Sequence, residues 1–117
     1  MTPDELKART KKFALDIIKL VDQLPNGRIS DVLAKQLLRS ATSVGANYRS
    51  ACKARSKADF ISKITVVEEE ADESQFWLEL IEGSKLSKSD TIQPLLREAK
   101  ELTAIFTASG KTAKWGK

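Results

Sequence analysis

The stretch from Gln36 to Phe60, QLLRSATSVGANYRSACKARSKADF, decides the fold predicted for this chain. Its first part repeats apolar residues at the three- and four-residue spacing of a helix, with alanine, serine and glycine in the middle. Gly45 in a helix interior costs about 1 kcal/mol relative to alanine, so we expect close packing against a neighbouring helix to compensate. Ser56 followed by Asp59 has the form of a capping box and predicts that a new helix begins there.

Helical apolar stripes continue on both sides of this stretch, and no strand pattern competes with them. Four helices are predicted, and their approximate ranges are 3–24, 30–55, 56–83 and 88–108. Because the connecting loops are short, sequence neighbours should pack antiparallel. The sequence therefore predicts an all-α fold, an antiparallel up-down-up-down four-helix bundle. Residues 1–108 form its single domain, and residues 109–117, which lack a pattern, are expected to be a flexible basic tail.

Charge divides the chain into two unlike halves. Residues 1–63 contain 13 Lys and Arg against 6 Asp and Glu, a net +7, whereas residues 64–117 contain 7 against 10, a net −3. A basic half can attract nucleic acid or acidic partners. Alternatively, both charge sets coat solvated helix faces, or the halves attract each other within the fold or between subunits.

A basic ridge follows the second helix and its turn. Positions 35, 39, 42, 46, 49 and 53 share one helical stripe, and two cations extend the charge into the turn. The candidate nucleic-acid-binding residues are Lys35, Arg39, Arg49, Lys53, Arg55 and Lys57. Such a ridge can follow a phosphate backbone, with an affinity that falls steeply with salt. The alternative is an ion-pair ridge facing the acidic third helix, an interpretation that we favour for Arg39 and Arg49 but not for the three residues nearest the turn.

The sequence contains few of the residue types and motifs on which enzyme catalysis usually depends. The chain has no histidine, one cysteine and no glycine-rich phosphate loop, so we expect no enzyme activity and no cofactor. The acidic run 68–73 leaves a carboxylate-only Mg²⁺ or Ca²⁺ site, using Glu69, Glu70 and Glu73, as a remote alternative. We expect instead that Glu70 or Glu73 is partly buried against Arg39 or Arg49, because a buried carboxylate needs a partner.

The sequence also predicts roles for the aromatic residues and the cysteine, and a location for the protein. Tyr48 and Trp77 are expected to anchor the core or an interface, and Cys52 to be a buried apolar residue. Tyr48 and Trp115 are the two candidates for stacking on bases. The apolar runs are too short to cross a membrane, and the chain begins without a secretory signal. A single cysteine agrees with a reducing compartment, so the cytoplasm is the expected location.

Beyond these patterns, the combination of RSATSVGANYR (39–49) with EADES (70–74) and WLEL (77–80) resembles the bacterial 23S rRNA intervening-sequence proteins. The resemblance covers nearly the whole chain. It implies a four-helix bundle and a homo-oligomer, with a pentamer the leading expectation. It also implies a basic surface for RNA or DNA, and no catalytic residues. A related group, the accessory proteins of diversity-generating retroelements, implies a reverse transcriptase as an alternative protein partner.

Two functions therefore compete at this stage. The first is a non-enzymatic oligomeric bundle that binds structured RNA, or another nucleic acid, through the basic ridge. The second is an interaction scaffold in which the charged ridges serve self-assembly and nucleic acid is ignored.

Overall fold

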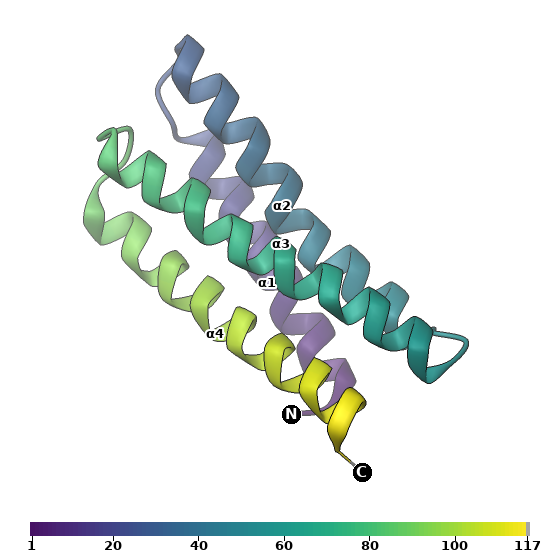
Figure 1. Cartoon of the computed structure of the whole chain (residues 1–117). Coiled ribbons are helices and arrows are strands. Elements are labelled where there is room, and N and C mark those ends of the chain that lie inside the picture. Colours follow the sequence, from purple (N-terminus) through teal and green to yellow (C-terminus); the bar gives the residue numbers. More distant parts are fainter. Residues whose placement is uncertain (117) are drawn as a thin grey trace.

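The computed structural model describes residues 1–116, and within them it contains four α-helices and no strand (Figure 1). The helices are α1 (Pro3–Asp22), α2 (Arg28–Cys52), α3 (Lys57–Gly83) and α4 (Ser89–Trp115). They form an elongated bundle of 47 × 21 × 20 Å in which each helix packs against the next and α1 also meets α4. The predicted all-α four-helix bundle is confirmed.

Side-chain caps start α1 and α3, and the cap of α3 is at the serine that the sequence predicts. At α1, the Thr2 hydroxyl accepts a hydrogen bond from the Glu5 amide at 3.1 Å, and the Glu5 carboxylate accepts from the Thr2 amide at 2.8 Å. At α3, the Ser56 hydroxyl accepts from the Asp59 amide at 3.0 Å. The Asp59 carboxylate instead accepts from the amide of Arg55, one residue before the cap, at 3.1 Å. Two side-chain hydrogen bonds, one accepted by Ser56 and one by Asp59, therefore stabilise the turn between α2 and α3.

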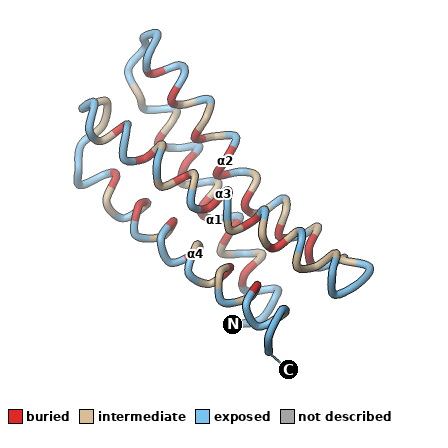
Figure 2. The backbone as a smooth tube through the Cα atoms, in the orientation of Figure 1, coloured by how far each residue is buried: buried red, intermediate tan, exposed pale blue. Residues whose placement is uncertain are grey.

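The core is a continuous stripe of buried residues along the inner faces of all four helices (Figure 2). Tyr48 is buried as expected, and its ring packs against Phe106 with the ring centroids 5.4 Å apart. The close crossing predicted at Gly45 lies between α2 and α1, because a Cβ added there would meet Thr10 Oγ1 at 3.3 Å. A glycine at this position lets the two backbones approach without a side chain between them.

Two local predictions were wrong. The segment 109–117 was expected to lack regular structure, but α4 continues to Trp115, and Gly110 is buried beside Ile64. Residue 117 lies outside the described part of the chain. Cys52 was expected to be buried, but it is the last residue of α2 and is exposed. Its neighbour Ala51 takes the inward position at that turn of the helix.

Candidate nucleic-acid interface

The six predicted basic residues are all exposed, but they lie in four different places. Arg39 faces α3, Arg49 faces α1, and three residues gather at the turn between α2 and α3. Lys35 lies one helical turn before Arg39 and about 20 Å along the helix from Arg49, at 1.5 Å per residue. Within residues 1–116, Arg39 is the one member of the six whose side chain makes an ion pair.

The α2–α3 seam, defined here as Arg39 with Glu70, Glu73 and Trp77, is an internal ion-pair cluster. The Arg39 guanidinium donates to Glu70 at 3.0 Å and also to Glu73. Glu73 accepts a further hydrogen bond from the Trp77 indole at 3.0 Å. The Glu70 side chain is only 17% exposed, which confirms the predicted partly buried carboxylate. Arg39 is therefore occupied by carboxylates of its own chain and is the weakest of the six candidates for a phosphate contact.

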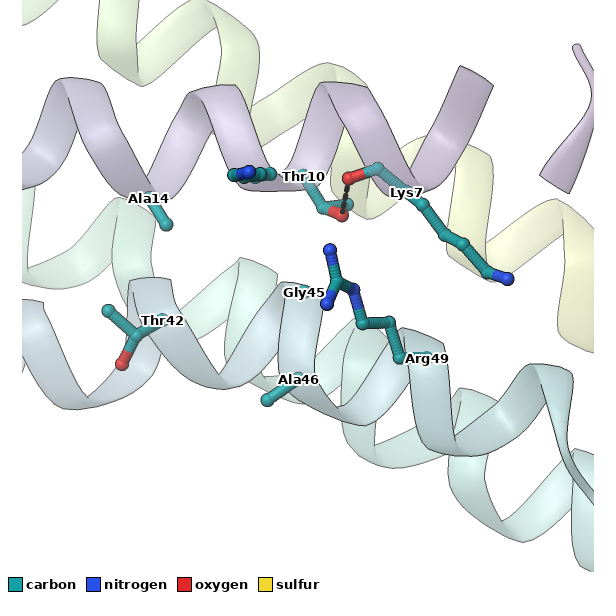
Figure 3. A pocket seen from close by; sticks show the side chains of 8 residues that line it. Lys7, Thr10, Ala14, Thr42, Gly45, Ala46 and Arg49 are labelled. Carbon is teal, nitrogen blue, oxygen red and sulfur yellow. Dashed lines mark hydrogen bonds between the residues drawn. The ribbon is translucent and has the colours of Figure 1, made fainter. Parts of the chain in front are cut away.

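Arg49 lines an open groove between α1 and α2, which we call the α1–α2 groove. Figure 3 shows the Arg49 side chain extending from α2 toward α1 beside Gly45, and Lys7 extending from α1 at the edge of the groove with its amine directed away from the Arg49 guanidinium. The groove has a volume of about 300 Å³ and contains no carboxylate in its lining. Its lining residues are Lys7, Thr10, Lys11, Ala14, Thr42, Gly45, Ala46 and Arg49.

Sequence reasoning missed the two lysines of this groove. Lys7 and Lys11 are one helical turn apart on α1, and neither makes an ion pair within the described residues. The available signal was the Gly45 crossing, which predicts a helix close to the Arg49 side of α2. The sequence does not say which helix this is, so α1 could not be assigned to the basic surface in advance.

The turn between α2 and α3 carries Lys53, Arg55 and Lys57, all exposed. Lys7 borders both the α1–α2 groove and a second hollow beside this turn, whose lining runs from Pro3 through Ala51 to Phe60 and contains no carboxylate. Phe60 and Lys57 in turn border a third hollow against the end of α4. The groove and the turn therefore form one surface, which we call the basic surface: Lys7, Lys11, Arg49, Lys53, Arg55 and Lys57.

One carboxylate does belong to the turn, and it is already engaged. Asp59 accepts the Arg55 amide and pairs with Lys63 at 3.2 Å, and these two contacts lower the pKa of its carboxyl. Of the two stacking candidates, Trp115 is 83% exposed at the end of α4, whereas Tyr48 is buried. Burial, followed by the neighbouring Cys52 thiol, raises the pKa of the Tyr48 hydroxyl. Tyr48 is therefore a core residue and not a base-stacking platform.

The acidic run of α3 does not gather into a metal site. Within residues 1–116, no group of three or more His, Cys, Asp or Glu side chains is placed to hold a metal ion. Glu70 and Glu73 are held by Arg39, and Glu68 accepts a hydrogen bond from the Thr107 hydroxyl at 2.6 Å. In the same part of the chain, no helix has the length and apolar character needed to cross a membrane.

Comparison with known proteins gives a family and a similar crystal structure. The family model described as 23S rRNA-intervening sequence protein matches residues 5–108. A crystal structure from Bacteroides thetaiotaomicron, described as a protein of unknown function from the S23 ribosomal protein family, is 34% identical to this chain. The alignment covers 96% of this chain and 100% of that chain, with a TM-score of 0.87. No curated protein sequence matches.

Proposed function

Because this chain belongs to the family of 23S rRNA-intervening sequence proteins, we propose that it is a non-enzymatic protein that binds structured RNA through its basic surface. The observation that carries the proposal is a group of cations without ion-pair partners among residues 1–116, all exposed except the half-buried Lys7, that runs from the α1–α2 groove to the α2–α3 turn. Arg39 leaves the set of candidates, because its guanidinium is neutralised within the chain. Lys35 remains a peripheral candidate on the same helix.

The physical basis is the release of counterions from the phosphate backbone. Each Lys or Arg that neutralises a phosphate displaces a condensed cation, so affinity falls linearly with salt on a log–log scale. Contacts of this kind position a protein without reading base sequence. The exposed Trp115 indole offers a stacking face for an unpaired base. We therefore expect binding that depends on RNA shape and charge more than on sequence.

Fluorescence anisotropy of a labelled RNA hairpin and a DNA duplex, titrated with the purified protein at low and moderate salt, tests the proposal. A variant with Lys53→Glu, Arg55→Glu and Lys57→Glu should lose at least about tenfold in RNA affinity and show a smaller salt slope. A matched control reverses Lys19, Lys88 and Lys100, which are also exposed, and reaches the same total charge. Equal losses in both variants, or no binding by the wild type at micromolar concentration, would overturn the proposal.

A second candidate function is an oligomeric scaffold. It is favoured by apolar side chains that are exposed in the first turns of α2 and in the C-terminal half of α3. Phe76 is 51% and Leu80 37% exposed on α3, and Ile29 and Val32 are 63% and 57% exposed in the first turns of α2. The four side chains lie on two helices that pack against each other, and large exposed apolar patches are typical of protein interfaces. We infer that they contribute to a homo-oligomer, for which a pentamer is the leading expectation. Intact mass in solution at two salt concentrations is the test, and a strict monomer in both would exclude the scaffold.

A further inference from the structure

We propose that the α1–α2 groove is a discrete subsite that seats one backbone phosphate of the bound RNA, held by Arg49, Lys7 and Lys11. This inference rests on the proposed function and makes it more specific: it names one site within the basic surface and the chemical group that the site takes.

Charge in the groove is the first argument. Three cations from two helices line one opening of about 300 Å³, and no carboxylate lies among its lining residues. Positive charge on both sides of an opening, with no carboxylate among the lining residues, favours the binding of an anion there. Arg39, ten residues away on the same helix, has two carboxylate partners. An arginine that helps to pack two helices of this chain is thus neutralised by acidic residues, whereas Arg49 is not.

The shape of the groove is the second argument. Ala14, Gly45 and Ala46 contribute almost no side chain to its walls, so the opening stays clear between the cations. The helices cannot close the opening by sliding together, because Gly45 already lies against Thr10. A planar guanidinium at the edge of such an opening can donate two parallel hydrogen bonds to a phosphate.

The two hydroxyls of the lining identify which groups do the binding. Thr10 donates to the Leu6 carbonyl at 2.9 Å, and Thr42 donates to the Leu38 carbonyl at 2.6 Å. Because both protons are engaged within their own helices, neither hydroxyl is free to donate to an anion. Recognition in the groove therefore rests on the three cations, and it predicts a ligand defined by negative charge and not by a base edge.

Two single variants test the subsite by independent means. Arg49→Glu reverses a charge in the groove, and Ala46→Trp fills the groove without changing any charge. Their matched controls on α4 are Lys100→Glu and Ala104→Trp, at exposed positions away from the groove. All four substituted positions are exposed, and circular dichroism confirms that each variant is folded. The measurement is the anisotropy titration with the RNA hairpin at several salt concentrations.

We expect Arg49→Glu and Ala46→Trp each to weaken RNA binding about tenfold, and Arg49→Glu to lower the salt slope by about one. Each control should change the affinity less than about twofold. If Ala46→Trp binds as Ala104→Trp does, or Arg49→Glu as Lys100→Glu does, the subsite is wrong even where the triple variant at the turn still loses affinity. If the wild type binds no RNA, the proposed function fails and the subsite fails with it.

Discussion

The α2–α3 seam and the α1–α2 groove differ although each is built around an arginine of the same helix. Arg39 lies between Glu70 and Glu73, whereas Arg49 lies with Lys7 and Lys11 and has no carboxylate beside it in the groove. Both arginines are exposed and belong to one predicted ridge. Exposure and sequence spacing therefore do not distinguish an arginine that stabilises the fold from one that is available to a ligand. The charges on the facing helix make that distinction.

Helix geometry explains how two members of one ridge come to face different neighbours. At 3.6 residues per turn, ten residues amount to a rotation of about 80° short of three full turns. Arg39 and Arg49 therefore lie at opposite edges of the ridge, one toward α3 and the other toward α1. The acidic helix α3 neutralises the first edge, and Lys7 and Lys11 of α1 add positive charge at the second.

The largest effect is expected where the groove depends on close packing. Gly45→Leu places a side chain against Thr10, whose hydroxyl is already fixed by its hydrogen bond to Leu6. Overpacking costs up to about 3 kcal/mol, and the better helix propensity of leucine returns roughly 1, so the free energy of unfolding should fall by about 2 kcal/mol. Urea denaturation measures the change. Ala46→Leu, at the exposed neighbouring position, is the control and should cost little; an unchanged midpoint for Gly45→Leu would show that the α1–α2 crossing is loose.

The same charge reversal should have unlike effects at the two sites. Arg39→Glu removes the partner of Glu70 and Glu73 and places a third carboxylate beside them, so we expect a loss of about 1.5 kcal/mol in the free energy of unfolding. Arg49→Glu places a carboxylate among lysines and should change stability by less than about 0.5 kcal/mol, or raise it. Urea denaturation of both variants gives the comparison directly. Equal losses would mean that the seam and the groove do not differ in the way the contacts indicate.

How far the sequence could predict this molecule follows from the same contrast. The four helices and their antiparallel order could be predicted, because apolar periodicity and capping residues act locally along the chain. The sequence predicted that Arg39 or Arg49 is the partner of Glu70, but it did not determine which of the two. That choice depends on how α2 is rotated about its axis. The lysines of α1 were missed for the same reason: the sequence predicts that α1 and α2 are neighbours, but not which faces of the two helices meet.

Two further errors have local causes. Residues 109–115 lack an apolar stripe of their own, and α4 continues there because Gly110 fits against Ile64. Cys52 lies beside the inward-facing Ala51, and a rotation of one residue at a helix end exchanges a buried position for an exposed one. The basic half of the sequence led to the hypothesis of nucleic-acid binding, but the residues of the basic surface could be identified only from the structure.

A smaller effect sharpens the description of the seam. A double-mutant cycle of Arg39→Ala and Glu70→Ala isolates the coupling between the two side chains. Because Glu70 is largely buried while Arg39 is about half exposed, we expect a coupling of about 0.5–1 kcal/mol, at the upper end of the range for surface pairs. The measurement is urea denaturation of the two single variants and the double variant. A coupling near zero would mean that the seam contributes specificity of packing and not stability.

The smallest effect concerns the carboxylate of the basic turn. Hydrogen bonding to the Arg55 amide, then the contact with Lys63, lowers the pKa of Asp59 from its ordinary value of 3.8. A lowered folded-state pKa means that the ionised carboxylate stabilises the fold above the unfolded pKa, and that this contribution is lost as pH falls through the folded pKa. Asp59→Asn should therefore lower Tm slightly at pH 7, and the difference from wild type should shrink below about pH 3.8. Thermal melts from pH 7 to pH 2.5 check this, with Asp72→Asn, at an exposed position of α3, measured alongside as the matched control. A difference in Tm that stays constant across this pH range would mean that Asp59 stabilises the turn through its hydrogen-bonding shape and not through its charge. The turn would then differ from the seam, where carboxylates act as charged partners of Arg39.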